Sequence, residues 1–205
     1  MQDKKLQTQL AALEAEEMTY EEKLKAQKEK VEDYTLYWNS DDPALYVGTY
    51  GKYNSEAGIF GSWIDLTMCD DYDEFMEVCR TLHADEEDPE FMFQDFQGFP
   101  EEWYSEFSFD EQTFNKILQY AELEDKEAFE AYMRATGDDD FESFSDRYIG
   151  KYDSEEEFAE YIVNEMYDLE KLIGRLAYCI DYKAYARDLF MDGYTFEDGY
   201  VFIDY

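Results

Sequence analysis

The sequence predicts an α+β protein, an elongated chain of three small domains preceded by an N-terminal helical extension. Residues 43–103 are rich in β-branched and aromatic residues separated by glycines, which predicts a β-sheet plus a helix. Apolar residues at helical spacing dominate residues 104–147, which predicts a helical middle domain. Residues 148–205 combine helical spacing with a final Asp-Gly turn signal, which predicts helices plus a β-hairpin. Residues 1–42 have a different pattern and are expected to form the extension.

The composition joins a strong negative charge to an aromatic content that can form a core. The 53 acidic and 17 basic residues of the 205-residue chain give a net charge of −36, which is typical of disordered acidic proteins. However, 45% of the residues are hydrophobic, 19% are aromatic and only three are prolines. Each aromatic side chain can bury roughly 150 to 250 Å². We therefore expect a folded protein with its charges outside the core.

Apolar residues in the extension follow a 4-3-4-3 spacing, and pairs such as Glu21 with Lys25 favour a helix. A coiled-coil arm is one interpretation. Because Glu17 and Gln27 fall in the apolar seam, a solvated helix with one apolar stripe is an equally good interpretation.

The turn-forming run Asn39–Pro43 marks the start of the first domain. Two strands are predicted at Leu45–Tyr50 and Ile59–Leu66. The acidic run Asp70–Asp73 supplies a cap and a negative first turn for a helix. Phenylalanine alternates with polar residues in Phe91–Phe96, which predicts a third strand in the same sheet.

The middle domain is predicted as two helices. The first begins near Asp110 and has Phe114 on its apolar face, and the second has Phe129 on its apolar face. Gly137 is expected to end the second helix.

The third domain is predicted as helices followed by a hairpin. Ser154 and Glu157 have the spacing of a capping box, which predicts a helix start. Leu172–Phe190 is predicted as a further helix. Tyr194–Tyr205 is predicted as a hairpin, because Asp198-Gly199 is a strong two-residue turn signal.

Sequence motifs for catalysis or cofactor binding are missing. A calcium loop needs D-x-[DN]-x-[DN]-G, and Asp71–Phe75 breaks that pattern. His83 is the one histidine, so zinc sites with several histidines are excluded, and we interpret it as an ordinary surface or boundary residue. Gly48 and Gly51 lack the third glycine of a phosphate-cradling motif. Any two of the 53 acids might lie at the separation that glycoside hydrolysis needs, so a pair of carboxylates does not indicate an enzyme here. We therefore predict no enzyme, no metal and no cofactor.

The cysteines Cys69, Cys79 and Cys179 form neither an even framework nor a C-x-x-C pair, so a reducing compartment is expected. No apolar run has the length of a signal peptide or a membrane span. The negative charge would repel nucleic acid phosphates and anionic lipid. We expect a cytoplasmic protein that binds neither nucleic acid nor membrane and whose partner is basic.

Acidic runs recur on every predicted domain. In Asp85–Phe99, carboxylates alternate with phenylalanines, so the rings can anchor a core while the carboxylates face water. One such run is most simply explained as solubilising surface, but lysines and arginines are too few to neutralise them all. We predict that the carboxylates stand in for phosphates, which duplex DNA presents at about one per 1.7 Å of axis. The predicted acidic surface consists of Asp70, Asp71, Asp73, Glu74, Glu77, Asp85, Glu86, Glu87, Asp88, Glu90, Asp95, Glu101, Glu102, Glu106, Glu122, Glu124, Asp125, Glu127, Glu130, Asp138, Asp139, Asp140, Glu142, Asp146, Asp153, Glu155, Glu156, Glu157 and Glu160.

Four blocks of sequence carry a family resemblance. They are Leu45–Asn54 with Gly61–Leu66, Asp88–Asp95, Gly150–Ala159 and Ile180–Leu189. In these blocks, and in their order, residues 44–205 resemble the ArdA-type antirestriction proteins, which are DNA mimics carried by plasmids and conjugative transposons.

The resemblance implies an elongated α+β protein of three small domains that dimerises through the C-terminal one. It also implies that the carboxylates imitate the phosphates of bent B-DNA and that the target is the methyltransferase core of type I restriction-modification enzymes. The family is not enzymatic. The extension of about 43 residues departs from the typical family member.

Two other functions remain open. The mimic could be directed at another basic DNA-binding protein, such as a nucleoid protein or a transcription regulator. An acidic calcium buffer is the other alternative, although the calcium loop is missing. Tyr178, Tyr182 and Tyr185 fall at helical spacing and are expected either in a dimer contact or in an ordinary core.

Overall fold

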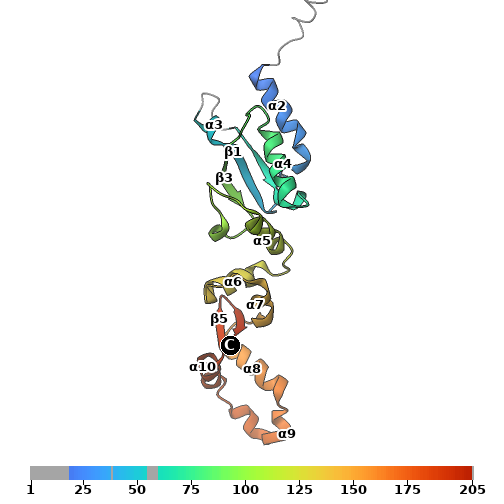
Figure 1. Cartoon of the computed structure of the whole chain (residues 1–205). Coiled ribbons are helices and arrows are strands. Elements are labelled where there is room, and N and C mark those ends of the chain that lie inside the picture. Colours follow the sequence, from blue (N-terminus) through green and yellow to red (C-terminus); the bar gives the residue numbers. More distant parts are fainter. Residues whose placement is uncertain (1–18, 38, 55–59, 205) are drawn as a thin grey trace, which may run out of the picture. The chain divides into compact units, whose positions relative to one another are not determined.

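The computed structural model describes residues 19–37, 39–54 and 60–204 of the chain. These residues form two compact units, one within residues 1–123 and the other within residues 124–205. Helices and two small antiparallel sheets make up the described structure, which confirms the predicted α+β class (Figure 1). No helix among the described residues is long and apolar enough to cross a bilayer. The division into three domains stays a prediction.

The first unit combines a three-stranded sheet with helices. Its helices are α2 (Tyr20–Lys30), α3 (Tyr50–Tyr53), α4 (Tyr72–Leu82) and α5 (Glu111–Ala121). Its strands are β1 (Ala44–Thr49), β2 (Ser62–Asp65) and β3 (Phe91–Gln97). Short 3-10 turns occupy Glu32–Tyr34, Leu66–Met68 and Glu101–Trp103.

The sheet of the first unit is antiparallel in the order β2-β1-β3. All three predicted strands are confirmed. Ala44 of β1 pairs with Asp65 on one side and with Gln97 on the other. A Cβ atom on Gly61 would lie 2.3 Å from the carbonyl oxygen of Val47, so only glycine fits where the chain enters β2.

Helix α4 begins as predicted and packs on the sheet. The Asp71 carboxylate accepts a hydrogen bond from the Glu74 amide at 2.8 Å and caps the helix. The fully buried Phe75 ring lies 6.3 Å from the ring of Phe93 in β3 and 5.9 Å from that of Phe114 in α5. Phe93 of β3 therefore anchors the core, as the alternating pattern predicted.

Helix α2 lies beside α4 in the first unit (Figure 1). It begins with a capping box in which Thr19 and Glu22 each accept a bond from the other's amide. Val31, directly after the helix, is 1% exposed, and Thr35 forms a bridge to Ile64 of β2. A helix in the extension is therefore confirmed for residues 20–30, whereas much of the proposed coiled coil falls on residues 1–18, outside the described residues.

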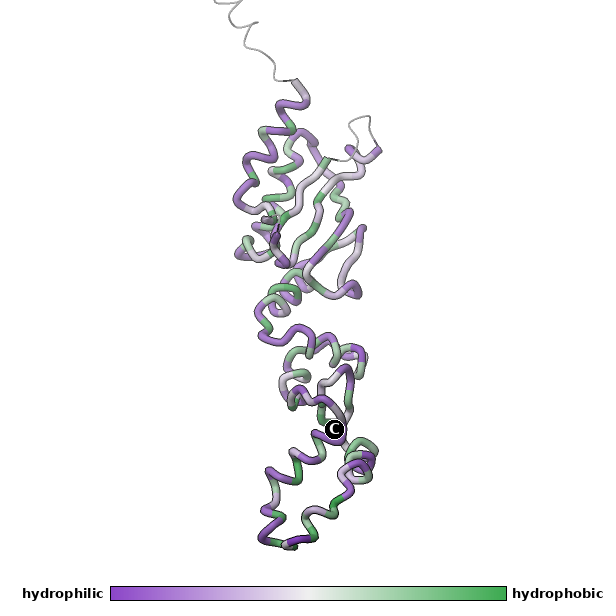
Figure 2. Tube along the Cα trace, turned by 180° about the vertical axis from the view of Figure 1, so that it is seen from behind, coloured by the Kyte–Doolittle hydropathy of each residue, from purple (hydrophilic) through white to green (hydrophobic). Residues whose placement is uncertain are grey.

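The second unit, like the first, combines a three-stranded sheet with helices. Its helices are α6 (Lys126–Thr136), α7 (Phe141–Arg147), α8 (Glu155–Met166), α9 (Leu169–Ile173) and α10 (Tyr182–Asp192). Its strands are β4 (Tyr148–Lys151), β5 (Tyr194–Glu197) and β6 (Tyr200–Ile203), in the antiparallel order β4-β6-β5. A 3-10 segment occupies Gly174–Cys179. Figure 2 shows hydrophilic and hydrophobic residues interleaved along the helices of both units.

The predicted terminal hairpin is confirmed. Asp198 has a φ of 50° and Gly199 a φ of 89°, the positive values that a tight two-residue hairpin turn requires. The third strand of this sheet, β4, was not predicted, and neither was α7, which precedes it directly. Both are short, so their periodicity is weak.

The predicted helix starts and stops in the middle of the chain are also confirmed. Asp110 caps α5, and Gly137 ends α6 in the left-handed conformation with a φ of 72°. In the core of the second unit, the Tyr132 ring of α6 lies 5.6 Å from Phe144 of α7 and 5.6 Å from Phe202 of β6.

One local prediction for the third domain was wrong. Leu172–Phe190 is not one helix, because Gly174 adopts a φ of 57° and a ψ of −131°, which ends α9, and Asp181 then caps α10. The helix start predicted at Ser154 is confirmed, because Ser154 is the N-cap of α8, but the capping box is only half formed. Ser154 accepts from the Glu157 amide at 3.1 Å, but the Glu157 carboxylate bonds the amide of Asp153 instead of that of Ser154.

Candidate interaction surface

Acidic side chains gather at the first turns of the helices. Asp71, Asp110, Asp125 and Asp140 each accept a hydrogen bond from the amide three residues later, at 2.8 to 3.0 Å. Three glutamates, Glu155–Glu157, form the first turn of α8. Unpaired amides and the helix dipole favour negative charge at this end of a helix. The acidic runs therefore stabilise the helices, and the helices fix their positions.

Many of the predicted surface acids project from the protein without an internal partner. We call outward carboxylates those whose side chains make no hydrogen bond or ion pair with any residue that the structure describes. They are Asp70, Asp73, Glu77, Glu87, Asp88, Glu90, Glu101, Glu102, Glu106, Glu122, Glu124, Glu142, Asp146, Asp153, Glu155, Glu156 and Glu160.

Asp85 and Glu86 differ from this set, because they face the buried ammonium group of Lys52. The Lys52 side chain is 3% exposed, and its Nζ lies 2.6 Å from Asp85 Oδ1 and 3.2 Å from Glu86 Oε1. The Thr49 hydroxyl donates to Glu86 Oε1 at 2.7 Å. Burial by itself raises the pKa of Asp85, but the hydrogen bond and charge of Lys52 hold it below its usual value. Sequence reasoning missed Lys52, since nothing local distinguishes a buried lysine from an exposed one.

His83 completes this buried cluster. An ammonium group can only donate hydrogen bonds, so Lys52 Nζ donates to His83 Nδ1 at 2.9 Å. The proton of the imidazole is therefore on Nε2, which donates to the carbonyl of Val47 at 3.3 Å. Burial, and then the positive charge of Lys52, lower the pKa of His83 to about 4. The ring is fully buried, so the interpretation as a surface or boundary residue was wrong.

Tyrosines engage other predicted acids. Tyr34 in the extension donates to Glu74 Oε1 at 2.6 Å, and this bond raises the pKa of Tyr34 to about 12. In the second unit, Tyr132 donates to Asp138 Oδ2 at 2.8 Å. These carboxylates therefore have structural roles in their own units.

A hydrogen-bond network joins the start of α6 to the second sheet. Tyr148 donates to Asp125 Oδ2 at 3.1 Å, and Tyr200 donates to Glu127 Oε2 at 3.0 Å. Lys151 in turn donates to the Tyr200 hydroxyl at 3.0 Å. Burial, followed by the hydrogen bond to Asp125, raises the pKa of Tyr148 to about 12. Within the described residues, no group of three or more His, Cys, Asp or Glu is arranged to hold a metal ion.

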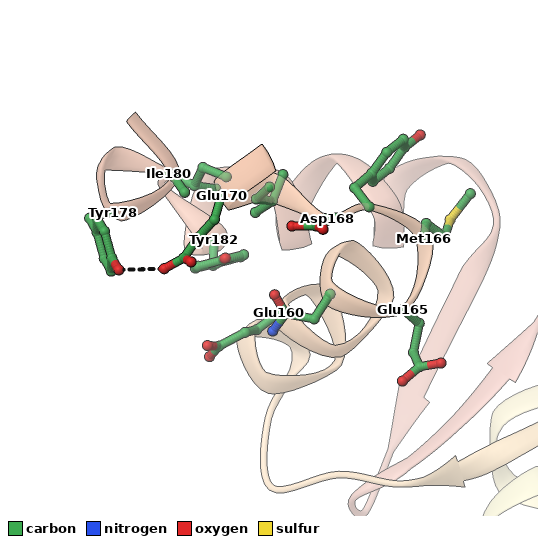
Figure 3. A pocket seen from close by; sticks show the side chains of 12 residues that line it. Glu160, Glu165, Met166, Asp168, Glu170, Tyr178, Ile180 and Tyr182 are labelled. Atoms are coloured by element: carbon green, nitrogen blue, oxygen red, sulfur yellow. Dashed lines mark hydrogen bonds between the residues drawn. The ribbon is translucent and has the colours of Figure 1, made fainter. Parts of the chain in front are cut away.

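The three tyrosines of the predicted dimer contact do not lie on one helix. Tyr178 belongs to the 3-10 segment and is 79% exposed, whereas Tyr182 begins α10 and Tyr185 follows within it. Figure 3 shows Tyr178 and Tyr182 at a hollow between the end of α8, α9 and the start of α10. The volume of this hollow is about 940 Å³. The Tyr178 hydroxyl donates to Glu170 at 2.6 Å (Figure 3).

Comparison with protein families decides the classification. The model of the antirestriction protein (ArdA) family matches residues 45–202. The chain belongs to the ArdA family. The ArdA match begins in β1 and ends in β6, so it takes in both units and all of the predicted acidic surface. Helix α2 lies outside the ArdA match. A search of curated proteins found no match to the chain.

Membership of the ArdA family supports an antirestriction protein, an inhibitor of restriction.

Proposed function

We propose that this ArdA-family protein inhibits type I restriction-modification enzymes by presenting carboxylates in place of DNA phosphates to the methyltransferase core. The observation that carries this proposal is the set of outward carboxylates, which have no lysine or arginine partner among the described residues. A DNA-binding groove gains affinity by exchanging counterions for phosphates. Carboxylates on a folded scaffold can provide the same gain without the cost of bending a duplex.

A plating assay tests the proposal in cells. Unmodified phage is plated on a host with a type I restriction system, with and without expression of this protein. The proposed inhibitor raises the plating efficiency toward that of a non-restricting host. An unchanged efficiency, with the protein present in soluble form, would contradict the proposal.

A binding assay separates this target from another basic DNA-binding protein. Purified type I methyltransferase core and a basic nucleoid protein are compared at the same ionic strength, each with and without competing duplex DNA. We expect the core to bind and duplex DNA to displace it. Tight binding to the nucleoid protein alone would favour the alternative target, since net charge by itself attracts both.

We also propose that two copies associate through the C-terminal part of the second unit. Apolar side chains are exposed there: Met166 is 64% exposed, Leu172 64% and Leu176 65%. Several exposed apolar side chains within one short segment favour a protein interface. Light scattering on the purified protein should give the mass of a dimer, and Leu172→Asp with Leu176→Asp should give that of a monomer. A monomeric unsubstituted protein would contradict the dimer.

A further inference from the structure

Helix α2 is outside the family match but is built into the first unit. The match begins at residue 45, whereas Val31 at the end of α2 is 1% exposed and Gln27 within it is 7% exposed. The chain that follows continues along the sheet, because the Leu36 amide donates to the carbonyl of Trp63 at 3.1 Å. The described part of the extension is therefore a component of this unit.

The helix covers acidic residues of its neighbour α4. In the 3-10 turn that follows α2, Tyr34 donates to Glu74 Oε1 at 2.6 Å. Tyr20 in the first turn of α2 and Gln27 in its C-terminal half lie beside the carboxylate of Asp85, which follows α4. Two members of the predicted acidic surface are thus occupied by the extension.

The same helix brings lysines to this face. Lys30 lines a shallow hollow of about 210 Å³ together with Glu74 and Glu77 of α4. Lys28 Nζ lies 5.0 Å from the centre of the Phe60 ring, and the buried Lys52 lies 4.7 Å from that centre. A basic groove that accepts phosphates repels such lysines, so α2 is unsuited to extend a phosphate-like surface.

We infer that α2 and the turn Glu32–Tyr34 that follows it form an intramolecular mask, which occupies one side of α4 and withholds Glu74 from a basic partner. This inference rests on the proposed function, because it assumes that the acidic surface meets a basic partner. The partner then contacts the first unit through outward carboxylates such as Glu87 and Asp88. The extension limits the usable surface instead of adding to it.

A charge-neutral substitution tests the mask. Ala26 lies in the middle of α2, where proline removes a helical hydrogen bond and breaks the helix. Ala26→Pro alters no charge, and Ala26→Ser is the matched control that keeps the helix. Affinity is measured for the type I methyltransferase core and, separately, for a nona-arginine peptide. We expect Ala26→Pro to bind both about two- to threefold more tightly, the effect of one or two exposed charge interactions, and Ala26→Ser to bind as the unsubstituted protein does. Equal or weaker binding by Ala26→Pro would overturn the inference.

A second comparison leaves α2 intact, in case the proline unfolds the unit. Glu74→Gln and Glu87→Gln each remove one negative charge, and Glu74→Gln keeps an oxygen for Tyr34. The mask predicts that Glu87→Gln weakens peptide binding about twofold while Glu74→Gln changes it little. Equal weakening by the two variants would refute the mask.

The two probes separate the mask from the proposed function. If the methyltransferase core fails to bind while the peptide binds, the proposed function fails and the mask is decided from the peptide measurements. If both bind and Ala26→Pro gives no gain, the mask alone fails.

Discussion

The Nζ atom of Lys52 lies 2.9 Å from Nδ1 of His83 in the interior of the first unit, and both side chains are almost completely buried. Two carboxylates, those of Asp85 and Glu86, compensate the ammonium charge. A protein with so large an excess of acids thus uses one of its few lysines inside a core, where the lysine joins α3 to the end of α4.

Removing Lys52 should destabilise the first unit strongly. In Lys52→Met the carboxylates of Asp85 and Glu86 lose their counterion in a mostly desolvated place, and breaking a buried pair in this way costs about 3 kcal/mol or more. All three tryptophans lie within residues 1–123, so tryptophan fluorescence during urea unfolding reports this unit. The control is Lys25→Met, which removes an exposed pair with Glu29 and should cost less than about 1 kcal/mol. Equal losses would contradict the role of the buried pair.

The stability of the first unit should fall as the pH falls from 6.5 to 4. The pKa of His83 is lowered from its ordinary value of 6.5 to about 4 in the folded protein, so the unfolded chain takes up the proton first. The histidine contribution is present in full above pH 6.5 and is lost progressively down to pH 4, by about 3 kcal/mol. Urea unfolding at several pH values should show a steeper loss for the unsubstituted protein than for His83→Asn. Parallel curves would disprove this assignment.

The hairpin turn should require glycine at position 199. Because Gly199 has a φ of 89°, alanine there is strained, and we expect Gly199→Ala to destabilise the second unit by about 1 kcal/mol. Asp198 has a φ of 50°, which asparagine also tolerates, so Asp198→Asn should be close to neutral. Thermal unfolding followed by far-UV circular dichroism measures both, and a neutral Gly199→Ala would argue against this turn.

Partner binding should depend on the sum of many carboxylates. Glu87 is exposed and has no hydrogen bond or ion pair within the described part of the chain, so Glu87→Lys should weaken binding to the methyltransferase core by about tenfold or less. The logarithm of the affinity should fall steeply with the logarithm of salt concentration. Isothermal titration at several salt concentrations measures both effects. Loss of all binding in this one variant would contradict a distributed surface.

Short-range signals made part of this fold predictable. The caps at Asp71 and Asp110, the stop at Gly137 and the turn at Asp198-Gly199 act through backbone groups a few residues away, so the local sequence contains the whole cause. The prediction of one helix over Leu172–Phe190 was wrong because the apolar spacing continues across Gly174, whose backbone conformation ends α9.

The sequence by itself determined that this chain folds around aromatic residues despite its charge, that it carries recurring acidic runs, and that it belongs to the ArdA family. Only the tertiary structure decided which acids are used internally. Lys52 and Asp85 are 33 residues apart, and Tyr34 and Glu74 are 40 apart. Such pairs form because packing α2, α3 and α4 on one sheet buries polar groups that must then find partners, and no local pattern records that outcome.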